Sequence, residues 1–471
     1  MHQSKPIRIL KSLSSWELKS LDDYIRSPFF NKNEKVIEAW EYISGFAPGF
    51  EDQKLGMEFC FKHLFPQEDY QSQKLRYVMT DLTRLIEGFL ISKNLEEKPY
   101  EREFVLLDAL EQRNLDKDFQ ETHRKLKKKI LSTDPQNSDD FVDVFRIVEK
   151  GYLYGVKTQN RNDQSTVDQV VNTLDQCYLA KKLRYSCEVI NRANVLNQSY
   201  ELFLTKEISN VFPLFSQLNH QLIQLYFITL QTLIDGENQN HFFQLKGLLE
   251  EHSDQLSLNE LRNLYAFALN YCIKKLNTGN AEFGQQIFEL YQTLVEKRII
   301  FEDGKLPVPH FKNTVAIGTR MKEYDWVEAF IEKYHHFLPE EEAKNAYTYN
   351  MAYLQFARGN YSQVKRLLSA VEFTDVFYQT DAKTTLIKTY YELEEFEPLI
   401  YLLGSFKVYL KRNKQISDYQ RKLYLNLVRI TQALVKYQLG EKITVAQIKE
   451  KMDKLPNMAA KQWVAQKVGK L

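Results

Sequence analysis

Turn-forming residues are scarce in this chain, and their scarcity is the strongest constraint on its fold. The sequence contains 16 Gly and 12 Pro among 471 residues, about half the usual shares of roughly 7% and 5%. All-β folds need many turns and nucleotide-binding folds need Gly-rich loops, so both classes are disfavoured. Apolar residues at 44% and charged residues at 27% are ordinary for a globular protein and argue against wholesale disorder.

Apolar residues recur at helical spacing in nearly every segment of the chain. Ser14 and Glu17 form a capping-box pattern, and Leu18 and Leu21 then follow at helical intervals. A long amphipathic segment, 101–131, ends in a cluster of cations, which the C-terminal end of a helix dipole favours. The sequence therefore predicts an all-α fold of about twenty helices.

Three aromatic residues in the last third of the chain are evenly spaced, 35 residues apart: Trp326, Tyr361 and Phe396. A small or apolar residue follows each of them three positions later: Ala329, Val364 and Leu399. Apolar residues also precede each aromatic residue at matching distances. The pattern predicts a repeated pair of helices over about 310–404, with weaker relatives around Phe242 and Phe283.

The segment Gly359–Leu368 resembles the turn and second helix of a tetratricopeptide repeat, whose period is about 34 residues. The copies around Trp326 and Phe396 lack the turn glycine, and Lys333 stands where the other copies have leucine. The resemblance implies a right-handed superhelical solenoid of helical hairpins and a role in scaffolding or peptide binding. The Lys and Asn residues with which that family binds a peptide carboxylate have no match here.

Breaks and composition divide the chain into four predicted segments. These are an N-terminal helical region at 1–95, a connector of long helical hairpins at 96–200, a tetratricopeptide-like solenoid at 201–404, and a basic helical cap at 405–471. The charged stretch around Pro99 marks the first boundary. The second boundary is set where the weaker repeats begin, at about residue 200.

Charge is distributed unevenly, although the formal net charge is only +1. Residues 405–471 contain 15 basic and four acidic residues, whereas 321–404 contain 14 acidic and eight basic residues. This asymmetry indicates an anionic partner for the C-terminal end, either nucleic acid or an acidic protein surface. Alternatively, the basic cap docks on the acidic repeats or on an acidic patch of a second copy.

No sequence motif indicates a catalytic, cofactor or metal site. The only adjacent histidines, His335 and His336, point about 100° apart on a helix and rarely bind one metal together. Four scattered cysteines do not make a disulfide framework and are expected as buried thiols in a reducing compartment. The start of the chain, 1–15, has no apolar core of a signal peptide, and no apolar run could span a membrane, so we expect a cytoplasmic protein.

These observations favour a non-enzymatic scaffold or adaptor without a cofactor, which binds a protein or peptide partner on a concave helical surface. The alternative is a nucleic-acid-associated repeat protein that uses its basic end for phosphate contacts. A helical-repeat enzyme would need a cluster of residues distant in sequence. The predicted partner-binding residues are two groove tyrosines and six cations: Tyr347, Tyr390, Lys407, Lys411, Arg412, Lys414, Arg421 and Lys422.

Overall fold

The computed structural model describes residues 2–158, 167–196, 204, 207–208, 210, 212, 220–369, 376–455 and 457–471. Within these residues the chain is all-helical, with 22 α-helices and no strand, which confirms the predicted all-α class. The chain divides into two compact units, Met1–Asp134 with Asp140–Leu174 and Pro135–Asp139 with Asp175–Leu471. The four segments drawn from the sequence remain a prediction, and the start of the third lies outside the described residues.

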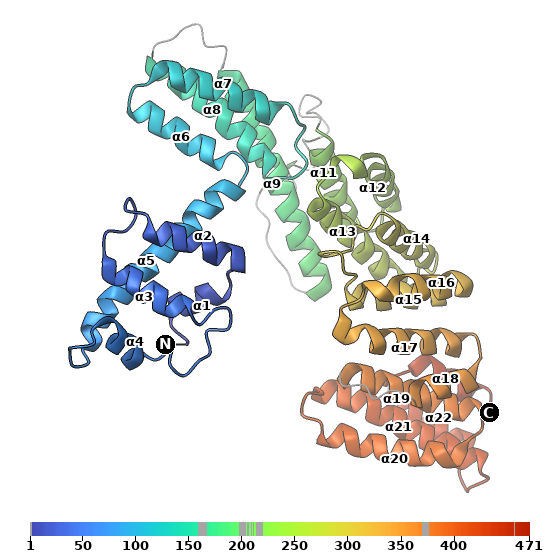
Figure 1. Ribbon diagram of the computed structural model, residues 1–471. Helices are drawn as coiled ribbons and strands as arrows, with labels where there is room; N and C mark the ends of the chain where they lie inside the picture. Colours follow the sequence, from blue (N-terminus) through green and yellow to red (C-terminus); the bar gives the residue numbers. More distant parts are fainter. Residues whose placement is uncertain are drawn as a thin grey trace. The chain divides into compact units, whose positions relative to one another are not determined.

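The first five helices of the first unit enclose one apolar core (Figure 1). Their bounds are α1 Lys5–Lys11, α2 Ser15–Arg26, α3 Glu34–Ser44, α4 Met57–Leu64 and α5 Ser72–Glu97. Trp40 lies in this core, and its indole N–H donates to Asp22 at 2.7 Å. The predicted capping box is confirmed, because the Glu17 carboxylate accepts from the Ser14 N–H and the Ser14 hydroxyl accepts from the Glu17 N–H.

A second core in the same unit joins the next helices. They are α6 Glu101–Gln112, α7 Asp116–Leu131, α8 Asp140–Thr158 and the first residues of α9, which spans Val167–Leu196. The amphipathic segment 101–131 forms two helices, not one. Asn114, with a φ of 52°, takes the left-handed conformation that ends α6.

The second unit consists of helical hairpins that contact one another in sequence order (Figure 1). The paired helices are α11 Gln221–Ile234 with α12 Gln239–His252, α13 Leu258–Asn277 with α14 Phe283–Glu296, α15 Val308–Arg320 with α16 Tyr324–Tyr334, α17 Glu340–Ala357 with α18 Tyr361–Ser369, and α19 Val376–Glu392 with α20 Phe396–Arg412. The chain then continues through α21 Asp418–Gln438, α22 Val445–Asp453 and α23 Lys461–Gly469. First helices of neighbouring hairpins also contact one another, such as α15 with α17 and α17 with α19.

The last three hairpins share one turn geometry. Lys322, Gly359 and Glu394 have φ values of 65°, 82° and 59°. In each turn the next residue donates its backbone N–H to a carbonyl five positions earlier, at 2.9–3.0 Å. Only Gly359 adopts this conformation freely, and the left-handed conformation costs Lys322 and Glu394 about 1–2 kcal/mol each. The turns without glycine are therefore the same structure, formed at an energetic cost that packing offsets.

The predicted repeat register is correct for two copies and wrong for the first. Val364 and Leu399 are completely buried, three residues after the start of α18 and α20. In the first copy, α16 starts at Tyr324, so the equivalent buried residue is Val327, whereas Ala329 is exposed. Trp326 is not the counterpart of Tyr361: its ring packs edge-on against Phe288 of α14, at 4.9 Å between centroids.

Candidate functional site

Two adjoining cavities follow the first helices of consecutive hairpins in the second unit. The first has a volume of about 420 Å³ and lies between α9, α13 and the turn after α11. The second, of about 620 Å³, is lined by α13, α14, α15, α17 and Gln462 of α23. Ile273 and Asn277 line both cavities, and we call the pair the inner groove. Each volume falls within the roughly 300–1,000 Å³ usual for ligand sites.

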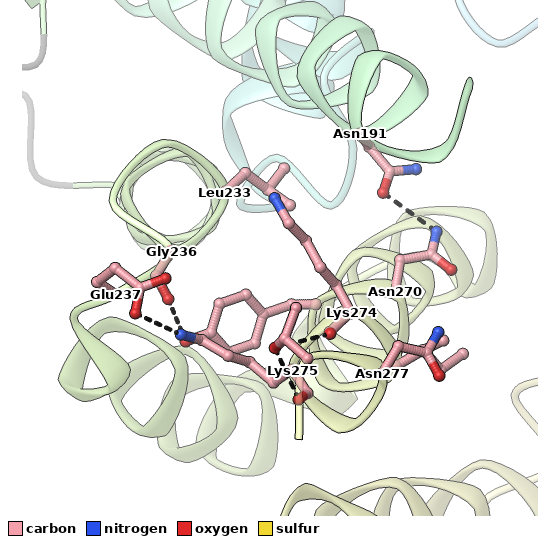
Figure 2. Close-up of a pocket in the computed structure, with 11 residues that line it drawn as sticks. Asn191, Leu233, Gly236, Glu237, Asn270, Lys274, Lys275 and Asn277 are labelled. Atoms are coloured by element: carbon pink, nitrogen blue, oxygen red, sulfur yellow. Dashed lines mark hydrogen bonds and ion pairs between the residues drawn. The ribbon is translucent and has the colours of Figure 1, made fainter. Parts of the chain in front are cut away.

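The first cavity has walls fixed by side chains of α13 (Figure 2). The Tyr271 hydroxyl donates to the Gly236 carbonyl at 3.1 Å, and burial raises the pKa of this tyrosine to about 12. Lys275 reaches Glu237 at 3.2 Å, with 8% of the lysine side chain and 96% of the glutamate side chain exposed. The buried lysine stem therefore forms part of the wall, while its charge meets a carboxylate in water.

The second cavity combines amide groups with an uncompensated positive charge. Asn313 hydrogen-bonds Tyr291, which counteracts the rise in the tyrosine pKa caused by burial. Arg320, the last residue of α15, is exposed and makes no ion pair with any described residue. Its charge lowers the pKa of the neighbouring Tyr353, although burial raises that pKa by more.

Amide side chains recur along the whole inner groove: Asn191, Asn270, Asn277, Asn313 and Gln462. Asn270 donates to Asn191 at 3.1 Å. Each amide carries both donors and an acceptor, so it can bond the N–H and C=O of an unpaired polypeptide backbone. The groove therefore offers partners to an extended peptide independently of its side chains.

The lining positions have a fixed offset from the turn of each hairpin. Asn277, Arg320 and Ala357 each stand two residues before the left-handed turn residue, and Ile273, Ala316 and Tyr353 each stand six before it. In α19 the same offsets select Glu392 and Lys388. Neither Glu392 nor Lys388 lines either cavity. The offset identifies groove residues in the sequence only where the turn of a hairpin has already been located.

Lys388 is a further functional candidate that sequence reasoning missed. Its Nζ lies 4.3 Å from the centroid of the Phe356 ring, beside Ala357 of the groove wall. Burial lowers the pKa of this lysine to about 8, against the opposing effect of Asp381 and Glu392. Glu392 is itself held by α23, because it accepts from the Trp463 indole at 2.7 Å and pairs with Lys467.

The two tyrosines predicted to bind a partner lie outside the inner groove. The Tyr347 hydroxyl donates to Glu332 of α16 at 2.8 Å, and the Tyr347 ring lies 4.9 Å from the ring of His335. Tyr390 packs against the C-terminal apolar core. Neither tyrosine lines either cavity of the inner groove. Tyr347 and Tyr390 stand 12 and four residues before the left-handed turn residue of their hairpins, whereas the lining residues stand two or six before it.

The six predicted cations gather at the α20–α21 end of the unit but differ in environment. Arg421 donates to the carbonyl groups of Leu410, Asn413 and Ile416 at 2.9–3.1 Å, so it closes the end of α20. The other five are exposed and make no ion pair with a described residue: Lys407, Lys411, Arg412, Lys414 and Lys422. One basic residue further on, Lys467, does contact the repeats through Glu392.

The histidine pair and the four cysteines all lie in the part of the chain that the structure describes. There, no group of three His, Cys, Asp or Glu residues could hold a metal ion, and His335 bonds backbone carbonyls through Nδ1. Burial raises the pKa of the Cys60 thiol to about 11, and burial also raises the pKa values of Cys187 and Cys272. Among the described helices, none is both long and apolar enough to span a bilayer.

No family model matches the chain, and neither a curated protein nor a solved structure matches it.

Proposed function

We propose that this chain is a non-enzymatic scaffold or adaptor that holds a segment of another protein in its inner groove. The observation that carries the proposal is the repetition of lining residues at fixed offsets from the hairpin turns, which makes one continuous surface from α13 to α17. A surface generated by a repeat is suited to an elongated ligand, because each hairpin contributes equivalent positions along it.

The chemistry of the inner groove supports a peptide as its ligand. Its amides match backbone groups, its apolar residues such as Ile273 and Ala316 accept side chains, and Arg320 attracts a carboxylate. We also propose that the hairpins form a tetratricopeptide-like right-handed superhelix. The proposed place of action is the cytoplasm. The basic C-terminal end then increases the rate at which an acidic partner associates.

We expect the substitution Ala316→Arg to abolish partner binding, because its side chain would fill the second cavity. The matched control is Ala329→Arg, which places the same side chain on the exposed surface of α16. The measurement is co-purification with the tagged full-length chain, with and without nuclease, followed by identification of proteins and nucleic acid. A stoichiometric protein that resists nuclease, is lost in Ala316→Arg and is kept in Ala329→Arg is the expected result.

The opposite outcome is equally informative. If every protein recovered with the unaltered chain is also recovered with Ala316→Arg, the inner groove is not the binding site and the proposal is wrong. Circular dichroism of both variants would verify that the helical content is unchanged, so that loss of binding is not loss of folding.

The second candidate function is nucleic-acid association through the exposed cations of α20 and α21. It is favoured by the five cations that lack an acidic partner among the described residues. If phosphate contacts dominate, the logarithm of the affinity for duplex DNA or RNA falls linearly with the logarithm of salt concentration. The combined change Lys411→Glu, Arg412→Glu and Lys414→Glu should then reduce that slope by about three. An affinity that does not change with salt would exclude this function.

A further inference from the structure

The outward side of α20 carries an apolar stripe among positive charges. Ile400, Tyr401 and Val408 have 51%, 81% and 47% of their surface exposed. With the exposed residues Gly404, Lys407, Lys411 and Arg412 they fall within an arc of about 140°, at 100° per residue. We call these seven residues the α20 face. They extend over about three helical turns, or roughly 18 Å.

The fold itself does not require the apolar stripe. The opposite side of α20 supplies the completely buried residues Leu399, Leu403, Phe406 and Leu410 to the C-terminal core. The apolar residues of the α20 face take no part in that core. A single exposed apolar residue is ordinary, but a contiguous apolar stripe on a helix indicates an interaction surface.

Gly404 gives a second, independent observation. A glycine in the middle of a helix costs about 0.5–1 kcal/mol relative to alanine. A methyl group built at Gly404 would meet no other atom within 4 Å, whereas one at Gly318 would lie 2.5 Å from Val327. The packing of the chain therefore explains Gly318 but not Gly404. A glycine on an exposed helix surface leaves a notch that lets another backbone approach closely.

The charges of the α20 face define the partner further. Lys407 and Arg412 lie on either side of the apolar stripe and Lys411 lies beyond its C-terminal end; none of the three makes an ion pair with any described residue. A nucleic-acid backbone would pair with these cations but would leave Tyr401 and Val408 uncovered. A partner with an apolar centre and acidic edges satisfies both features.

We propose that the α20 face binds an amphipathic helix of a partner protein, with its closest approach at Gly404. The apolar side of that helix covers Ile400, Tyr401 and Val408, and its flanking Asp or Glu residues pair with the cations. Ile400, Gly404 and Val408 stand four residues apart, the spacing at which one side of a helix presents successive positions to a partner helix. The inference goes beyond the proposed function, because it concerns a second surface and does not depend on the inner groove.

The test uses a phage-displayed library of helix-forming peptides of about 15 residues, four turns long, selected on the immobilised full-length chain. We expect selected peptides to carry Asp or Glu beside an apolar stripe. The substitution Gly404→Gln should weaken their binding by at least about tenfold, while thermal stability stays the same or rises, since Gln is a better helix former. The matched control Ser405→Gln, on the neighbouring exposed residue, should bind as the unaltered chain does.

Three outcomes would overturn the inference. The first is a selection that yields no peptide whose binding depends on Gly404, and the second is a set of selected peptides without acidic residues. The third is binding of duplex DNA, or of vesicles that contain phosphatidylserine, that is lost in Lys411→Glu/Arg412→Glu but unchanged in Gly404→Gln. The groove variant Ala316→Arg should bind the selected peptides normally, so failure of the groove proposal and failure of this one are distinguishable.

Discussion

Replacing Glu260 by alanine is expected to lower the free energy of unfolding of the second unit by about 3–5 kcal/mol. Glu260, at the start of α13, is only 2% exposed. Its carboxylate accepts from the Ser138 backbone N–H at 3.0 Å and from the Tyr226 hydroxyl, and it lies 3.9 Å from the Arg184 guanidinium. The effect is large because the substitution leaves a buried hydroxyl and a buried amide without their acceptor and removes the counter-charge near the Arg184 guanidinium.

The same cluster makes a graded series of variants informative. Burial, followed by the charge of Glu260, raises the pKa of Tyr226 far above its ordinary value, so this hydroxyl remains a donor at every relevant pH. Glu260→Gln keeps an acceptor of similar shape and should cost less, about 1–3 kcal/mol. The control is Glu188→Ala, which removes an exposed pair with Arg192 and should change stability by no more than about 0.5 kcal/mol.

The measurement is urea unfolding followed by circular dichroism, with hydrogen exchange of α11 and α13 to assign the loss to this unit. If Glu260→Ala lowers the free energy of unfolding by less than about 1 kcal/mol, water replaces the carboxylate as acceptor for the Ser138 N–H and the Tyr226 hydroxyl, and the cluster contributes little to stability.

The second large effect is expected at Gly318, where alanine should destabilise the protein by about 1–3 kcal/mol. A methyl group there would lie 2.5 Å from Val327 and 3.2 Å from Phe288. Val327 is completely buried and branched, so it cannot move aside cheaply. The change therefore forces α15 away from α14 and α16, although alanine is the better helix former by about 1 kcal/mol.

Gly404→Ala is the matched control for that prediction, because it makes the same change in a helix where the new methyl group meets nothing within 4 Å. Here only helix propensity acts, and stability should rise by about 0.5–1 kcal/mol. Thermal melts of both variants measure the difference. Two changes of the same sign would mean that close packing does not determine the effect at Gly318.

Several features of the fold were predictable from short stretches of sequence. The helical class follows from apolar spacing, and the capping box at Ser14 depends on residues within one turn. The hairpin turns before Tyr361 and Phe396 were located correctly, because the buried residue three positions later repeats with them. Each of these depends on neighbours in the chain, and short-range spacing is what a single sequence records directly.

The register of the first hairpin was not determined locally. Trp326 matches the aromatic repeat in sequence, but the large ring packs against Phe288 of the preceding hairpin, and Tyr324 takes the first position of α16. Tyr347 and Tyr390, predicted from sequence to bind a partner, do not line the inner groove. A shift of one residue rotates a side chain by about 100° around its helix, so small register errors decide which surface it lines.

The sequence by itself determined that the chain is helical, that a capping box at Ser14 starts a helix, and that a strongly basic end follows an acidic segment. Only the tertiary structure decided which residues meet: Asn277, Arg320 and Gln462 in one groove, and Glu260 with Ser138, 122 residues apart. The physical reason is that caps and apolar spacing act within a few residues, whereas grooves and buried polar clusters depend on how separate helices pack.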